Sequence, residues 1–195
     1  HQTFENKVIA ELGRKFYGSM ALFVMDIDDF KLINDALGHY EGDRVLADVA
    51  LKLKQISKRY GGYAGRVGGD EFSVFIPEIS KKEQIEEIAG NLVKDIGDMP
   101  CDIKHTTSIG IYMKSDNEDI DYYEMYRRAD KALYSSKRAG KNRYSFYEDT
   151  GNTEENLSDE AKAVFIDTEY MLLDNYNAIS YISDLNNYDL YYINN

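Results

Sequence analysis

The feature that most constrains this chain is a glycine pair followed by two carboxylates, Gly68-Gly-Asp-Glu-Phe72. Apolar runs flank it, from Tyr63 to Val67 and from Phe72 to Ile76. Two such runs joined by a glycine turn are typical of a β-hairpin. Because glycine has no Cβ, the turn can bend sharply and a bulky ligand can approach the backbone. We therefore expect an antiparallel pair of strands with two carboxylates at its tip.

A second acidic segment lies upstream of this hairpin. The apolar run from Ala21 to Met25 is typical of a strand buried on both faces, and it leads into Asp26, Asp28 and Asp29. Asp26, expected at the strand end, is a candidate to share a divalent cation with the hairpin acids. The alternative at both places is a solvated polar loop. The Asp-x-Asp-x-Asp-Gly spacing of an EF-hand calcium loop is missing.

Hydrophobic periodicity and turn residues predict a mixture of helices and strands. An apolar stripe between Val45 and Ile56 indicates a helix, and Ser80 to Glu83 fits a capping box that opens another. Gly140 fits the end of a third helix. We expect helices over 4–16, 31–37, 42–60, 80–96 and 121–139, and strands over 20–27, 63–67, 72–76, 106–113 and 144–147.

Composition excludes some classes of function. The 195 residues carry a formal net charge of −12, which argues against binding a nucleic-acid backbone through broad electrostatics. No apolar run reaches the ~18 residues that a membrane-spanning helix needs. The one cysteine, Cys101, allows no intrachain disulfide. We expect a cytoplasmic domain, which could belong to a membrane-anchored parent protein.

The charge is uneven along the chain. Residues 1–150 carry a net charge of −4, whereas residues 151–195 carry −8 with a single base, Lys162. A polar stretch places a boundary near Thr150 to Thr153. We expect a domain over 3–150 and an acidic tail over 151–195, with an amphipathic helix over 158–175 followed by two short strands.

Six blocks occur in one order along the chain: Asp26 to Asp35, Gly38 to Asp43, Gly68 to Phe72, Ser108 to Gly110, Ala129 to Tyr134 and Lys137 to Asn142. Together they resemble the GGDEF family, the diguanylate cyclases, over roughly residues 3–147. The resemblance implies an α/β (α+β) domain with a palm-like, mixed, largely antiparallel central sheet flanked by helices, as in nucleotidyl cyclases.

The resemblance also implies a metal site and a catalytic pair. Asp26 and Asp70 would hold the metal, with the backbone carbonyl of Ile27 beside them. Glu71 would be either a further metal ligand or the base near the attacking hydroxyl, and the sequence does not separate the roles of the two hairpin acids. Carboxylate and phosphate oxygens suit Mg²⁺, and Mn²⁺ is a second candidate.

By the same resemblance, Asn34 and Asp43 read guanine and His39 lies near the substrate. An amide and a carboxylate match the donors and the acceptor on guanine's Watson–Crick edge. The alternatives are ordinary structural roles. Asn34 could cap a helix, Asp43 could be a charge at a helix N-terminus, and His39 could be a packed, hydrogen-bonded histidine.

The triphosphate would meet backbone amides and lysines. The amides of Asp29 and Phe30, together with Lys31, resemble the family's phosphate cradle. Lys137 and Lys141 are four residues apart and are expected on one face of a helix end. The family commonly has arginine in place of Lys141, and lysine lacks the bidentate fork. Alternatively, both lysines simply decorate a helix C-terminus.

Three departures from the family pattern matter. Many members carry an inhibitory Arg-x-x-Asp site before the hairpin, and here Arg59 is present but Gly62 replaces the acid. We therefore expect weak or absent product inhibition through this site. The family's opening Asp-x-Leu-Thr-Gly-Leu-x-Asn-Arg segment is missing, so we expect a fragment of a longer protein with sensor domains upstream and downstream. The tail is similar to the truncated start of a PAS-type domain.

Two functions remain open. The first is a diguanylate cyclase that condenses two GTP into cyclic di-GMP and two pyrophosphates with Mg²⁺, as a homodimer of facing domains. The second is a non-catalytic GTP-binding or regulatory GGDEF module within a larger signalling protein. The enzyme is favoured because the chain keeps all of the candidate site residues Asp26, Asn34, Asp43, Asp70, Glu71 and Lys137.

Overall fold

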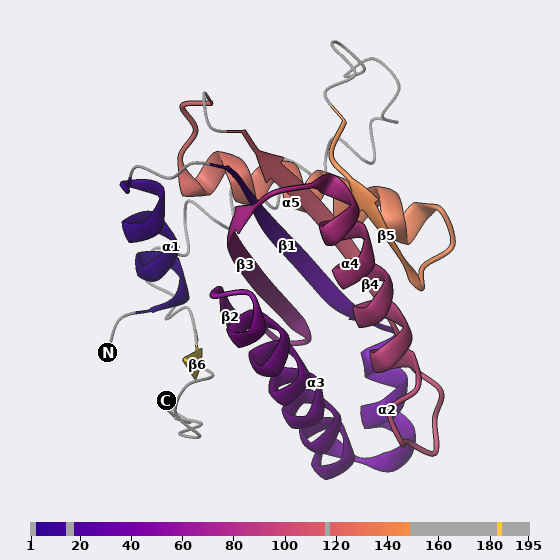
Figure 1. Cartoon of the computed structure of the whole chain (residues 1–195). Helices are drawn as coiled ribbons and strands as arrows, with labels where there is room; N and C mark the ends of the chain where they lie inside the picture. The colour runs from indigo at the N-terminus through magenta and orange to yellow at the C-terminus, as the bar shows by residue number, and fades with distance from the viewer. Residues whose placement is uncertain (1–2, 15–17, 116–117, 149–182, 185–195) are drawn as a thin grey trace, which may run out of the picture. The chain divides into compact units, whose positions relative to one another are not determined.

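A β-sheet with helices on both faces organises the chain (Figure 1). The computed structural model describes residues 3–14, 18–115, 118–148 and 183–184. The strands are β1 (Ser19–Asp28), β2 (Tyr63–Gly68), β3 (Glu71–Ile79), β4 (Thr106–Lys114), β5 (Arg143–Phe146) and β6 (Ser183–Asp184). The helices are α1 (Phe4–Leu12), α2 (Phe30–Leu37), α3 (His39–Arg59), α4 (Lys82–Gly97) and α5 (Tyr122–Arg138).

The strand order is β5-β4-β1-β3-β2-β6. Strands β4 and β5 run parallel, and each other neighbouring pair is antiparallel. The central strand β1 pairs with β3 on one side and β4 on the other, so its backbone hydrogen-bonding groups are used on both edges. This confirms the mixed, largely antiparallel sheet that the family resemblance implies.

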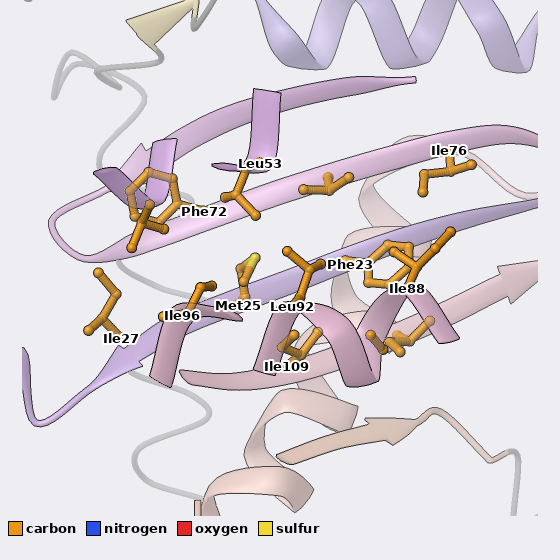
Figure 2. Close-up of a cluster of buried hydrophobic side chains, with 14 of the residues drawn as sticks. Phe23, Met25, Ile27, Leu53, Phe72, Ile76, Ile88, Leu92, Ile96 and Ile109 are labelled. Carbon is orange, nitrogen blue, oxygen red and sulfur yellow. The ribbon is translucent and has the colours of Figure 1, made fainter. Parts of the chain in front are cut away.

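Alternation along β1 divides the core into two layers. Side chains at odd positions, such as Phe23 and Met25, pack with α3 and α4, and Figure 2 shows both beside Leu92 of α4. Even positions, such as Leu22 and Val24, pack with α1 and α5. Because successive side chains of a strand point to opposite faces, a strand that is apolar at every position is buried on both sides.

Helix α5 lies directly against β4 at Gly110. A Cβ added to Gly110 would stand 2.0 Å from the carbonyl oxygen of Ala129 and 2.1 Å from the backbone nitrogen of Leu133. The glycine therefore sets how closely the helix approaches the sheet, since any side chain would push the two backbones apart.

The hairpin between β2 and β3 turns at Gly69, whose φ is +44°. The Arg66 side chain closes the turn by donating from Nε to the Gly69 carbonyl oxygen at 2.7 Å. Asp70 lies in the turn, and Glu71 is already the first residue of β3. The expected hairpin with two acids at its tip is confirmed.

Several expected boundaries are wrong. Helix α1 ends at Leu12 rather than 16, α3 begins at His39 rather than 42, and β1 continues through Asp28, so Asp26 lies inside the strand. The capping box at Ser80 does not form: the N-cap of α4 is Lys81, and no side chain caps it.

The tail mostly lies outside the described residues. This applies to the predicted amphipathic helix over 158–175 and to the second predicted strand. The first predicted strand of the tail covers 179–184, and its last two residues, Ser183 and Asp184, form β6 and pair with Arg66 and Gly65 of β2. The domain boundary near 150 stays a prediction. Within the described part of the chain, we find no helix long and apolar enough to cross a membrane.

Candidate active site

The candidate site lies on the α5 face of the sheet, where three strands meet. Asp26 of β1 pairs across the sheet with Glu71 of β3 on one side and Ser108 of β4 on the other. These positions continue the alternation that buries Leu22 and Val24 against α5. The apolar stripe gives way to carboxylates at the end of the sheet that carries the hairpin turn.

Lys137, in the last turn of α5, reaches Asp26. Its Nζ atom lies 2.9 Å from Asp26 Oδ2. Burial raises the pKa of Asp26, and the charges of Asp70 and Asp28 add to this, while the hydrogen bond and charge of Lys137 oppose it. The lysine therefore partly neutralises a carboxylate that the fold holds away from water.

Glu71 has the same kind of environment. Burial is the largest cause that raises its pKa, followed by the charge of Asp26, and Lys137 acts in the opposite direction. Asp130 of α5 contributes negative charge as well, and burial also raises the pKa of Asp130. A carboxylate-rich, half-buried face of this kind favours a cation.

The backbone ties the hairpin turn to β1. The N–H of Ile27 donates to the carbonyl oxygen of Asp70 at 3.3 Å, while the Ile27 side chain is buried in the opposite layer of the core. The charges of Asp70, Asp26 and Glu71 interact. Among the described residues, however, no three His, Cys, Asp or Glu side chains are close enough together to hold a metal ion.

Asn34 and Asp43 lie on consecutive helices. Asn34 is inside α2 and Asp43 is in the second turn of α3, so the alternative in which Asn34 caps a helix is wrong. A Cβ on Gly42 would stand 2.0 Å from Asn34 Oδ1, so this glycine leaves room for the amide. His39 is exposed at the start of α3, contrary to a packed histidine.

The predicted phosphate cradle is the junction of β1 with α2. Asp29 occupies the N-cap position of α2 with φ of +56°. Phe30 and Lys31 are the first two helical residues, whose N–H groups have no partner within a helix. Phe30 is buried and Lys31 is exposed, so the ring anchors the junction while the ammonium stays in solvent.

Lys141 does not share a helix face with Lys137. Helix α5 ends at Arg138, and Lys141 follows Gly140 in left-handed backbone, with φ of +62°. Its Nζ atom lies 2.7 Å from Asp29 Oδ1. The two lysines therefore form ion pairs with different acids: Lys137 with Asp26 and Lys141 with Asp29. In the sequence, Asp28 lies between these two acids.

Sequence reasoning missed the role of Asp28 and the proximity of Asp130. The Asp28 side chain is buried and accepts hydrogen bonds from Thr106, Ser108 and Asn142. A signal was available, because Asp28 is two residues beyond Asp26 and therefore lies on the same face of β1. For Asp130 a signal was also available, because it lies in the Ala129 to Tyr134 block and, seven residues before Lys137, shares the helix face of that lysine.

Arg59 lies away from these carboxylates, at the end of α3. Its guanidinium carbon is 5.7 Å from the centroid of the Tyr60 ring, and it helps to line a pocket between α3 and α4. A Cβ on Gly62 would stand 2.1 Å from the carbonyl oxygen of Phe75. The acid that is missing from the inhibitory pattern could not be placed there without moving β3.

Comparison with known proteins identifies relatives of this chain. A family model described as diguanylate cyclase, GGDEF domain, matches residues 1–143. The probable diguanylate cyclase DgcT of Escherichia coli (strain K12) is 38% identical over 128 residues, which cover 63% of this chain and 28% of the relative. Diguanylate cyclase DgcP of Pseudomonas aeruginosa is 38% identical over 131 residues, covering 65% of this chain and 19% of the relative.

A solved structure gives the same result. The active GGEEF domain of a diguanylate cyclase from Vibrio cholerae superposes with a TM-score of 0.65 at 30% identity, covering 76% of this chain and 99% of that domain. The chain thus spans less than a third of the two curated relatives but nearly the whole of the isolated domain. From its family match, its relatives and its fold, the chain belongs to the GGDEF family of diguanylate cyclase domains.

Proposed function

We propose that this chain is a diguanylate cyclase domain that condenses two GTP into cyclic di-GMP and two pyrophosphates. The observation that carries the proposal is the pairing of Asp26 with Glu71 on the α5 face, with Lys137 bonded to Asp26. Carboxylates for a metal and an ammonium for phosphate thus come together from three separate elements. A module that only kept the fold would not need this arrangement.

The residues present fit a magnesium ion by their chemistry. Asp26, Asp70 and Glu71 offer carboxylate oxygens, and Ile27 offers a backbone carbonyl, all of which are hard oxygen donors. Burial raises the pKa values of Asp26 and Glu71, and the charges of neighbouring carboxylates raise them further, so a bound cation would stabilise the charged forms. When bound, Mg²⁺ would offset charge on the α-phosphate and lower the pKa of the attacking hydroxyl.

The protein's own groups would orient the substrate. The Asp43 carboxylate would accept hydrogen bonds from the N–H groups of guanine, and the Asn34 amide would donate to its carbonyl oxygen. The N–H groups at the start of α2, with Lys31, Lys137 and Lys141, would bind the triphosphate. Glu71 would either join the metal ligands or accept the proton of the 3′-hydroxyl, and a base with a raised pKa suits the second role.

Catalysis would need two copies of the domain. Each 3′-hydroxyl attacks the α-phosphate of the other GTP, so a P–O bond forms and a pyrophosphate leaves at each of the two steps. Each domain would bind one GTP, and a homodimer of facing domains would bring the two GTP molecules together. The input signal would come from other domains of the parent protein, whose cytoplasmic location stays a prediction.

The test is incubation of concentrated protein with GTP and Mg²⁺, with products identified by mass spectrometry. We expect cyclic di-GMP from the parent chain and from Glu87→Ala, an exposed acid on α4, but none from Asp70→Ala. The rate per protomer should rise with protein concentration, because the reacting species is a dimer. Metal-dependent GTP binding without any product at high concentration would instead support the non-catalytic GTP-binding module.

A further inference from the structure

Asp28 is a buried carboxylate for which the proposed reaction has no use. It is the last residue of β1 and is 4% exposed. Its Oδ1 accepts from the Ser108 hydroxyl at 2.6 Å. Its Oδ2 accepts from the Thr106 hydroxyl at 2.6 Å and from the backbone N–H of Asn142 at 3.0 Å.

All three of these donors are neutral. A buried carboxylate without a bonded cation is unfavourable unless its oxygens are well satisfied by hydrogen bonds. Two of the donors, on β4, only join strands that already pair through their backbones. The third donor, the N–H of Asn142, joins β1 to the segment beyond the end of α5. An apolar residue at position 28 could not form this long-range hydrogen bond.

The segment that receives this link has an unusual backbone. Three consecutive residues have positive φ: Gly140 at +108°, Lys141 at +62° and Asn142 at +50°. Left-handed backbone is unfavourable for a residue with a Cβ, so such a turn needs bonds that hold it. The N–H of Lys141 donates to the Ser136 carbonyl oxygen at 3.1 Å, and the N–H of Asn142 donates to Asp28.

The turn presents the Lys141 ammonium to the phosphate cradle. Lys141 Nζ is 2.7 Å from Asp29 Oδ1, and Asp29 is the residue next to Asp28 in the chain. The hydrogen bond with Asp29 raises the pKa of Lys141, and the charges of Asp29, Asp28 and Asp26 contribute further. Asp28 is therefore linked to both sides of the cradle, through the chain on one side and through Asn142 on the other.

We propose that Asp28 is a positioning residue for the triphosphate. Asp28 holds the turn at Lys141 against the end of β1, so that the Lys141 ammonium meets the phosphates bound at the start of α2. The proposal rests on the proposed function, because the triphosphate comes from it. Asp28 itself touches no reacting atom. Its effect on binding should pass through Lys141 and should be specific to ligands that carry the β- and γ-phosphates.

The experiment measures binding of two ligands with Mg²⁺ by calorimetry: the non-condensable α,β-methylene analogue of GTP, and GMP. Asp28→Ser keeps a hydroxyl for the β4 partners but lacks the second oxygen. We expect its dissociation constant for the triphosphate analogue to rise about tenfold, as for one lost hydrogen bond to a charged group, with GMP binding unchanged. Asp28→Asn, whose amide oxygen can still accept from Asn142, should restore most of the affinity.

A double-mutant cycle with Lys141→Ala tests whether the effect passes through Lys141. In the Lys141→Ala background, Asp28→Ser should produce no further loss. Equal losses for both ligands, or losses that add fully in the double variant, would overturn the proposal in favour of a general structural role. If Asp28→Ser does not fold, Asp28→Thr, which also lacks the oxygen that accepts from Asn142, replaces it in the cycle. An unchanged affinity there would equally count against Asp28.

The outcomes separate this inference from the proposed function. Wild-type protein that binds neither ligand with Mg²⁺ would overturn the proposed function and this inference with it. Wild-type protein that binds the triphosphate analogue, with an Asp28→Ser variant that binds it equally well, would overturn this inference alone.

Discussion

The ammonium of Lys137 lies 2.9 Å from Oδ2 of Asp26. This ion pair connects the last turn of α5 to β1, and so it joins a candidate phosphate ligand to a candidate metal ligand. If a metal and a triphosphate bind here as proposed, the carboxylate and the ammonium would each gain a new partner of opposite charge. Binding of the metal and of the nucleotide should therefore be coupled.

Replacing Lys137 by methionine should weaken binding of the metal-bound triphosphate analogue by about tenfold or more, since a charge-assisted contact is lost. Calorimetric titration of the variant measures this directly. Arg138→Met is the matched control, because Arg138 is the next residue in the same turn and lies over the Tyr134 ring at 5.7 Å. Equal losses in both variants would show that only the overall positive charge matters.

Gly42→Ala should impair the reading of guanine. The added Cβ would stand 2.0 Å from Asn34 Oδ1 and 3.1 Å from Cζ of the buried Phe30 ring, so the amide has to move aside. Displacing Asn34 should reduce the preference for the GTP analogue over the ATP analogue by about tenfold, as measured by competition binding. Gly97→Ala, whose Cβ would meet the His105 carbonyl oxygen at an ordinary 3.9 Å, should leave that preference intact.

The pH dependence of stability should change in Glu71→Gln. Burial raises the pKa of Glu71 above its ordinary 4.5, so the folded state holds this proton more tightly than the unfolded state does. The stabilisation from that proton is present below pH 4.5 and is lost as the pH rises through the raised pKa. The variant never carries the charge, so without metal it should be more stable than wild type at neutral pH, and the difference should shrink in acid.

Denaturant unfolding of both proteins across this pH range measures the difference in the free energy of unfolding. Glu87→Gln, at an exposed position on α4, serves as the control and should track wild type. A Glu71→Gln variant less stable than wild type at neutral pH would contradict the assignment of an unfavourable buried charge.

Arg59 should not support product inhibition. Its partner acid is absent, and Gly62 has no room for a side chain because the Phe75 carbonyl oxygen lies 2.1 Å from the Cβ position. We expect cyclic di-GMP to affect wild type and Arg59→Ala to the same small extent in an assay of initial rate. Tight binding of cyclic di-GMP that disappears in Arg59→Ala would refute this.

Gly110→Ala should be strongly destabilising, by about 3 kcal/mol or more, because the new Cβ meets backbone atoms that cannot move independently of α5 and β4. Gly90→Ala gives the contrast. Within the described part of the chain, its Cβ meets one side-chain atom, of Tyr144, at an ordinary 4.0 Å, and the change should stabilise α4 by about 0.5–1 kcal/mol. Thermal unfolding of the two variants should move in opposite directions, and a similar loss in both would contradict the close contact at Gly110.

Local patterns were enough to predict much of the fold. The glycine turn and the apolar runs beside it predicted the hairpin, and the continuous apolar run of β1 predicted a strand buried on both faces. The ion pairs of the lysines could not be predicted, because Lys137 and Lys141 look alike in sequence. They differ because α5 ends at Arg138 and the chain then turns left-handed. The bonds of Asp28 needed the register between β1 and β4, which aligns residues 78 apart in the chain.

The close contact at Gly110 has a consequence for how genetic variation in this domain should be interpreted. Lys137 belongs to α5, the helix that packs closely on β4 because Gly110 has no side chain. The packing of Ala129 and Leu133 against Gly110 therefore determines the position of the Lys137 ammonium. If the proposed cyclase function holds, substitutions at these buried positions would lower activity without contacting a ligand. In a deep mutational scan selected for activity, substitutions at these packing positions would score as low as substitutions of the candidate metal ligands. A parallel measurement of protein abundance would separate the two groups.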